Sequence, residues 1–289
     1  MKIYLPLLYS ERIKRPNKKY FLRTILGEDF LILLLSFAYH SIYFWQTGIA
    51  LFLLQISFWC IYELGYIEND IIGEKFEDEP VLSCNYNSNK YSLYSWQPWA
   101  WSFVLSSISI FFIQRLDINH TIDLIPFTQN SNWIINIAES CFSWMAFLAM
   151  VKLIFSIYNH LSKQSRVWFY SLLQVCRYCG YLILFTVNTT SLMLLISITV
   201  SRWIQYIIYR YVLGKGIKLP MYFPRYFFCF IIFILLTAIT AINERDLSIL
   251  FNYQLFAISG FCFLRGYKHF RKVFSEFVLV SKNGSDYIK

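Results

Sequence analysis

The chain has 289 residues, of which 57% are hydrophobic and only 15% are charged. Soluble domains carry about 25% charged residues, so this composition excludes an ordinary water-soluble enzyme or binding domain. The net charge of +9 does not indicate a nucleic-acid-binding protein, because the basic residues gather at the edges of apolar blocks, where anionic lipid headgroups would lie. The composition predicts a single all-α transmembrane domain over residues 1–289.

The N-terminal residues 1–28 are rich in lysine and arginine and are interrupted by Pro6 and Pro16. They contain no continuous apolar core of the kind that a cleavable signal peptide needs. We therefore expect a basic cytoplasmic arm that precedes the first membrane span.

Eight apolar blocks follow this arm, each near the length of about 20 residues that a membrane-crossing helix needs. The predicted spans are Phe30 to Trp45, Gly48 to Ile67, Trp96 to Leu116, Trp133 to Ile157, Val167 to Val187, Thr189 to Tyr211, Tyr222 to Ile242 and Leu247 to Leu264. Only two residues separate the first block from the second, so these two are expected to form a tight helical hairpin.

The distribution of lysine and arginine predicts the topology. The N-terminal arm, the loops after the second, fourth and sixth spans, and the tail at 265–289 are basic, whereas the other loops carry at most one basic residue. This alternation satisfies the rule that basic loops face the cytoplasm. We therefore expect a multi-pass protein with about eight spans, or nine, and with both termini cytoplasmic in an inner or plasma membrane. The basic tail also has a helical apolar stripe, which predicts a helix in the cytoplasmic interface.

The end of the second predicted span carries an acidic ridge. At about 100° per residue, Glu63, Glu74 and Glu77 fall within about 40° of Asp70, and Tyr66 lies beside them. Like charges four residues apart on a helix repel, and a divalent cation would offset this repulsion. Mg²⁺ prefers oxygen ligands and often shares them with substrate phosphates. The ridge therefore predicts a Mg²⁺ site.

A solvated acidic loop is the alternative interpretation of this ridge, because Pro80 and several serines and asparagines follow it. Glu63 favours the functional interpretation, since it lies inside an apolar span and an ionisable side chain at membrane depth is costly.

On these residues the chain resembles the UbiA-type intramembrane prenyltransferases. Their first signature, Asn-Asp-x-x-Asp-x-x-x-Asp, follows the second span and holds the Mg²⁺–diphosphate of an isoprenoid donor. Asn69 and Asp70 match it, Gly73 replaces the middle acidic residue beside Glu74, and Glu77 is a conservative change at the last position. The resemblance implies that Asn69, Asp70, Glu74 and Glu77 are metal ligands and that Asp70 and Glu74 are catalytic.

The chain departs from this family in two respects. The family's second acidic signature follows the sixth span, but the loop at 209–220 contains no carboxylate, and the family usually has nine spans. The Arg15-Pro16 pair also resembles the segment before the family's first span. The resemblance thus covers the first six spans and one signature.

Several polar side chains lie in or near the other spans. We expect four arginines to bind a diphosphate or lipid phosphate, because one guanidinium group can donate two parallel hydrogen bonds to phosphate oxygens. These are Arg166, Arg177, Arg202 and Arg210. The alternative is that each arginine extends to the membrane interface. Glu63, Tyr66 and Tyr178 are candidate cavity residues. Lys152, inside the fourth span, must find a partner on another element.

The sequence therefore predicts an enzyme that binds a prenyl diphosphate or related lipid phosphate through Mg²⁺ and transfers the prenyl group to an acceptor. The expected partners are membrane lipids and this substrate, with no nucleic acid. The alternative is a non-catalytic lipid or solute transporter, or a membrane component of an assembly.

Overall fold

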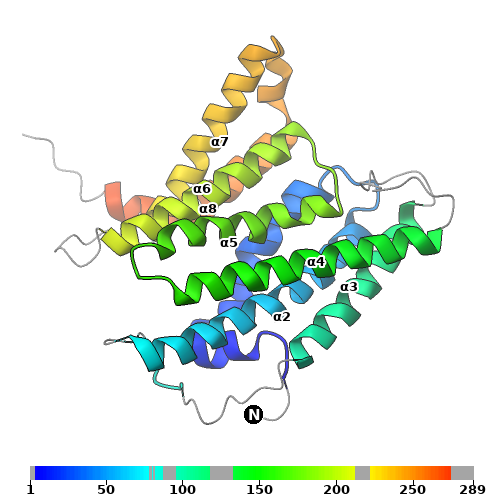
Figure 1. Ribbon diagram of the computed structural model, residues 1–289. Coiled ribbons are helices and arrows are strands. Elements are labelled where there is room, and N and C mark those ends of the chain that lie inside the picture. The colour runs from blue at the N-terminus through cyan, green and yellow to red at the C-terminus, as the bar shows by residue number, and fades with distance from the viewer. Residues whose placement is uncertain are drawn as a thin grey trace, which may run out of the picture. The chain divides into compact units, whose positions relative to one another are not determined.

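The structure is a computed structural model that describes residues 4–77, 80, 82–86, 96–117, 133–211 and 222–274. Helical turns account for 84% of these residues, and they include no strand. The predicted all-α class is therefore confirmed. The chain divides into two compact units, Met1–Thr199 and Val200–Lys289, and each is described by itself (Figure 1). The prediction of one transmembrane domain stays a prediction.

The first unit begins with a short helical turn and a continuous helix that contains wide π-type turns. Its elements are η1 (Ser10–Lys14), η2 (Phe21–Phe30), α1 (Leu31–Leu33), η3 (Leu34–Ala38), α2 (Phe44–Phe76), α3 (Trp96–Asp117), α4 (Trp133–His160), α5 (Arg166–Cys179) and the 3₁₀ turn η5 (Gly180–Ile183). Helix α6 (Thr189–Tyr211) then passes from the first unit into the second.

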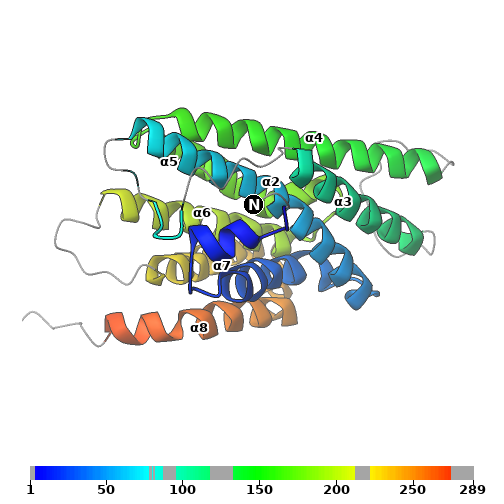
Figure 2. The same ribbon diagram turned by 90° about the horizontal axis from the view of Figure 1, so that it is seen from below.

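Helix α2 forms the core of the first unit. It packs against both α3 and α4, and the three helices lie side by side in both ribbon views (Figures 1 and 2). Leu54, Phe58 and Trp59 on this helix are almost completely buried. A helix that is apolar on all its faces is expected at the centre of a bundle, where neighbours cover every side.

Small polar side chains fasten α2 to its neighbours. Ser57 donates a hydrogen bond to the carbonyl oxygen of Ser102 on α3 at 2.9 Å, and Trp144 Nε1 on α4 donates to Ser57 Oγ at 3.1 Å. Ser109 on α3 donates to the carbonyl oxygen of Ala50 at 2.7 Å. Small residues let helix backbones approach closely, and their hydroxyls then bond across the interface.

The second unit contains the end of α6 together with α7 (Phe223–Asn243), the 3₁₀ turn η6 (Leu247–Phe251) and α8 (Tyr253–Phe274). Helix α7 packs against α8. Arg225 Nε on α7 donates to Gln205 Oε1 on α6 at 2.8 Å, so a buried guanidinium has a polar partner inside this unit.

Four helices of the described residues are long and apolar enough to cross a membrane: α2, α4, α6 and α7. Each lies on a predicted span, and α6 has the predicted bounds.

Several predicted spans have other bounds in the structure. The hairpin break predicted at Gln46 and Thr47 is wrong, because both residues lie inside α2 and the break falls between Ala38 and Phe44. Helix α2 also continues past Ile67 to Phe76, and the last predicted span begins as the turn η6 before α8 starts at Tyr253. The first span was predicted to begin at Phe30, but its helix already includes Glu28 and Asp29, which are buried and so do not mark a solvent edge. The α-helix predicted from Val167 to Val187 ends at Cys179, because a 3₁₀ turn follows.

The close approach of α4 to α2 at Gly65 predicts a stability effect. A methyl group at Gly65 would overlap the ring of Phe155. We expect Gly65→Ala to cost about 1–3 kcal/mol by overpacking, which lowers the melting temperature of the detergent-solubilised protein by roughly 3–10 °C.

Gly260→Ala on α8 is the matched control, since nothing lies within 4 Å of the added methyl group. Alanine is the better helix former, so this variant should melt at the wild-type temperature or above it. Equal melting temperatures for the two variants would contradict the proposed packing.

Candidate functional site

The N-terminal residues 4–20, here called the strap, are held against α2 by Glu63. This buried carboxylate accepts hydrogen bonds from the hydroxyl of Tyr4 at 2.7 Å, the backbone N–H of Leu7 at 3.0 Å and the backbone N–H of Ser10 at 2.5 Å. Burial, and next the charge of Glu63, raise the pKa of Tyr4 well above its ordinary value, so this phenol stays a donor. Glu63, predicted as a cavity residue, anchors the strap.

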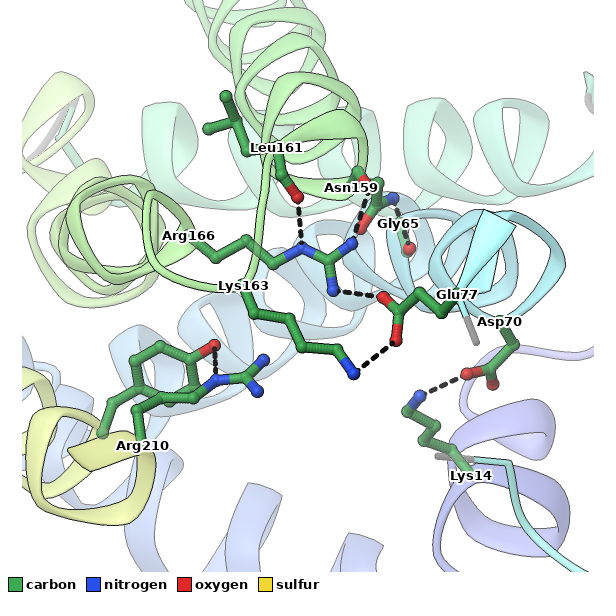
Figure 3. A network of polar contacts seen from close by, with 10 residues as sticks. Lys14, Gly65, Asp70, Glu77, Asn159, Leu161, Lys163, Arg166 and Arg210 are labelled. Atoms are coloured by element: carbon green, nitrogen blue, oxygen red, sulfur yellow. Dashed lines mark hydrogen bonds and ion pairs between the residues drawn. The ribbon is translucent and has the colours of Figure 1, made fainter. Parts of the chain in front are cut away.

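Asp70 holds the strap a second time, two turns further along α2. Its carboxylate accepts a hydrogen bond from the hydroxyl of Tyr9 at 2.6 Å. It also pairs with the ammonium group of Lys14, as Figure 3 shows. The Asp70 side chain is only 4% exposed. Burying a carboxylate to this degree is costly unless donors and a counter-charge replace its lost hydration.

The remaining carboxylates of the ridge have different partners. Glu77 pairs with Arg166 at 2.6 Å and with Lys163 at 3.7 Å, as Figure 3 shows. Arg166 also donates to the carbonyl oxygens of Asn159 and Leu161, at 2.9 and 3.0 Å. This arginine, at the start of α5, thus binds the C-terminal end of α4. Glu74 accepts from the hydroxyl of Tyr86 at 3.1 Å, and Asn69 lies partly exposed on α2.

These contacts bear on the predicted Mg²⁺ site. Asp70, Glu74 and Glu77 each face a different protein partner, and two of them are neutralised by basic side chains. Among the described residues, no group of three or more His, Cys, Asp or Glu side chains is placed to hold a metal ion. The arrangement described for these carboxylates does not fit a Mg²⁺ cluster, and Mg²⁺ binding stays a prediction.

Glu68, which was not singled out from the sequence, joins α2 to α4. It pairs with Lys152 at 2.5 Å and accepts hydrogen bonds from Ser156 at 3.0 Å and Asn159 at 3.3 Å. The prediction that Lys152 has its partner on another element is confirmed. Asn159 also donates to the carbonyl oxygen of Gly65 at 3.1 Å, at the point where α4 comes closest.

Arg177 has a buried carboxylate partner that the sequence analysis missed. Its Nε atom donates to Asp29 Oδ2 at 3.0 Å, and Nη2 bonds the same oxygen. The hydroxyl of Tyr178 donates to Asp29 Oδ1 at 2.8 Å. Both charged side chains are at most 4% exposed, so Arg177 does not extend to an interface. A carboxylate next to an apolar block, with an arginine inside another block, was the signal available in the sequence.

Four aromatic side chains form one cluster next to these charges. Tyr20 lies edge-on to Trp59 at 5.9 Å between ring centroids, Trp59 to Tyr62 at 5.1 Å, and Tyr62 to Tyr66 at 5.3 Å. We call Tyr20, Trp59, Tyr62 and Tyr66 the aromatic cluster. None of the tyrosine hydroxyls of this cluster bonds to another residue that the structure describes.

Three cations lie over the faces of this aromatic cluster. The guanidinium of Arg177 is 4.8 Å from the centroid of Trp59, that of Arg15 is 4.6 Å from Tyr20, and the ammonium of Lys14 is 5.9 Å from Tyr66. Such contacts stabilise a desolvated cation by up to about 2 kcal/mol.

Arg15 differs from the other two cations. Lys14 and Arg177 pair with Asp70 and Asp29, but no carboxylate in the described part of the chain pairs with Arg15. Electrostatic interaction with Tyr20 raises the pKa of the Arg15 guanidinium, while the nearby positive charge of Arg177 opposes this rise. The guanidinium groups of Arg15 and Arg177 therefore lie on the same aromatic cluster. Of the two, Arg177 pairs with a carboxylate and Arg15 does not pair with one among the described residues.

The other predicted phosphate ligands, Arg202 and Arg210, belong to the second unit. Arg202 is buried in α6, and Arg210 Nε donates to the hydroxyl of Tyr206 at 3.0 Å. Their joint action with Arg177 stays a prediction.

Comparisons of the chain with protein-family models, with curated proteins and with solved structures find no match. The resemblance to the UbiA-type prenyltransferases therefore depends on the sequence signature alone.

The buried pair of Asp29 and Arg177 predicts a non-additive stability effect. Removing one partner leaves the other charge buried and alone, which costs about 3–5 kcal/mol. We expect Asp29→Leu and Arg177→Met each to lower the melting temperature strongly, and the double variant to lose less than the sum of the two.

Arg23→Met, on an exposed side chain of the same first helix, should stay within about 0.5 kcal/mol of wild type. Strictly additive losses in thermal unfolding would show that the two side chains do not stabilise each other.

Proposed function

We propose that this chain is a multi-pass membrane protein that binds a prenyl diphosphate, or a related lipid phosphate, at the aromatic cluster. The observation that carries the proposal is Arg15, a partly buried guanidinium with no carboxylate partner among the described residues, beside Arg177. A guanidinium group presents paired N–H donors that match phosphate oxygens. A phosphate group is therefore the anion that best completes this arrangement.

We further propose about eight membrane spans, with both termini cytoplasmic in an inner or plasma membrane. The four long apolar helices and the alternation of basic and non-basic loops support this topology. The phosphate site would then lie at the cytoplasmic end of α2, where the basic strap meets the bundle.

The surroundings of Arg15 favour an amphiphilic ligand over free phosphate. Trp59, Tyr62 and Tyr66 form a wall of aromatic rings beside the cation. Trp59 and Tyr62 are already almost completely buried, and Tyr66 is the partly exposed ring of the three, so an isoprenoid chain would gain contact with Tyr66. Apolar surface removed from water there contributes roughly 25 cal/mol per Å². We therefore propose the phosphate at Arg15 and the start of the hydrocarbon chain beside Tyr66.

Prenyl transfer is the reaction that fits such a ligand, in keeping with the resemblance to UbiA-type enzymes. The allylic C–O bond breaks, its electron pair leaves with the diphosphate, and the acceptor forms a new bond to the allylic carbon and loses a proton. Arg15 would neutralise charge that develops on the leaving diphosphate.

A non-catalytic membrane component is the second candidate, and one observation favours it. Asp29, Glu68 and Glu77 each pair with a basic residue of another element, as structural ion pairs do. A protein of this kind would keep the bundle and its ion pairs without transferring a group.

Arg15→Gln tests the proposed binding site. We expect it to weaken the binding of geranylgeranyl diphosphate to the detergent-solubilised chain by about 10- to 100-fold, because one charge-assisted hydrogen bond contributes about 1.5–3 kcal/mol. Isothermal titration calorimetry measures the effect.

Arg12→Gln is the matched control, since it removes the same charge from an exposed position three residues away. An equal loss of affinity in both variants would mean that the general charge of the strap, and no defined site, attracts the ligand.

The double variant Asp70→Asn with Glu74→Gln tests the predicted metal dependence. If Asp70 and Glu74 exchange their present partners, Lys14 and Tyr86, for Mg²⁺, the ion should strengthen the binding of geranylgeranyl diphosphate relative to a sample in EDTA, and the double variant should lose this difference. The enzyme proposal is contradicted if Mg²⁺ has no effect in wild type or has the same effect in both proteins.

A further inference from the structure

The strap carries part of the site that it covers. Lys14, Arg15 and Tyr20 belong to the strap, whereas Trp59, Tyr62 and Tyr66 belong to α2. The cation without a carboxylate partner therefore reaches the aromatic cluster only while the strap lies against α2. The site is incomplete whenever the strap is released.

The strap is attached both by buried side chains and by polar contacts. Tyr4, Leu7, Tyr9 and Tyr20 are buried, and the backbone N–H of Tyr4 donates to Gln97 Oε1 on α3 at 2.7 Å. Two carboxylates on one ridge of α2 supply further polar contacts. Glu63 holds Tyr4, Leu7 and Ser10, and Asp70 holds Tyr9 and Lys14. Glu63 and Asp70 are separated by seven residues, so they lie on one face of the helix. Glu63 takes three donors on its two oxygens, which makes it the main anchor.

The backbone of the strap is held in a strained conformation. Leu7, Asn17 and Lys19 have positive φ angles of 68°, 63° and 47°. This left-handed region costs an ordinary L-residue about 1–2 kcal/mol. The N–H of Leu7 is one of the donors to Glu63, so the anchor and the strain coincide. Such strain persists only where surrounding contacts impose it. Opening the strap would relieve the strain, which lowers the free-energy cost of opening.

We propose that the strap is a closing element of the phosphate site, with Glu63 as the positioning residue that docks it and the bound phosphate as the ligand that locks it. This inference rests on the proposed function. An anion at Arg15 would bind the closed strap in preference to the open one, and it would stabilise closure by RT ln(1 + [L]/Kd). Closure and anion binding are then reciprocally coupled.

Limited proteolysis of the full chain in detergent tests the proposal. Trypsin cuts after Lys14, which is paired with Asp70 in the closed strap, when the strap opens, and with fast opening the cleavage rate follows the open population. Mass spectrometry of the N-terminal fragments measures this rate. Inorganic pyrophosphate at ten times its dissociation constant should slow cleavage of wild type by about tenfold.

Two variants separate docking from locking. Glu63→Gln should speed cleavage by about tenfold or more without pyrophosphate, because it weakens three hydrogen bonds to a charged acceptor. Arg15→Gln should leave the rate without pyrophosphate nearly unchanged and should abolish the protection that pyrophosphate gives. Tyr4→Phe removes one donor to Glu63 and should show a smaller acceleration, which keeps the test valid if Glu63→Gln does not fold.

Glu68→Gln is the control on the same helix, since its carboxylate binds α4 and not the strap. The proposal is overturned if Glu63→Gln is cleaved at the wild-type rate, if Glu68→Gln is cleaved as fast as Glu63→Gln, or if pyrophosphate leaves wild-type cleavage unchanged. Geranylgeranyl diphosphate that binds wild type without slowing cleavage would refute the strap and leave the function standing. Protection by pyrophosphate without any binding of the prenyl ligand would refute the function alone.

Discussion

The structure of the first unit depends on the need of each buried charge for a partner. Helix α2 lies at the centre of this unit and carries Glu63, Glu68 and Asp70 on its second half. Desolvating a carboxylate is so costly that the surrounding chain must supply donors or cations. The strap supplies hydrogen-bond donors to Glu63 and a lysine to Asp70, and α4 supplies a lysine to Glu68. These polar contacts decide which segments cover α2, whereas its apolar faces would accept many neighbours.

The same constraint shapes the candidate site. The burial of Arg177 is compensated by its ion pair with Asp29 and by its contact with the ring of Trp59. Arg15 lies over Tyr20 with no carboxylate partner in the part of the chain that the structure describes. Ring faces attract a cation but do not neutralise it. The region thus combines a satisfied arginine, which fixes the geometry, with a second one that retains capacity for an anion.

Some of this arrangement could be predicted from the sequence. Apolar length predicted α6 with its observed bounds, and the cost of a charge at membrane depth correctly predicted a partner for Lys152 on another element. The strap could not be predicted, because much of its attachment uses backbone N–H groups, which every residue carries. The role of Asp29 as the partner of Arg177 was not predicted, because an acidic residue at the edge of an apolar block is usually interpreted as the place where the chain enters water. Only long-range pairing distinguishes the two cases.

The pair of Asp29 and Arg177 spans 148 positions of the chain, which has a consequence for biosynthesis. A ribosome delivers the first helix of the proposed membrane topology long before it delivers α5. Until then Asp29 lacks its partner, and an unpaired aspartate disfavours the insertion of the helix that carries it. The first helix should therefore wait at the translocon or the bilayer surface while α2 inserts, and enter fully only after Arg177 has been translated.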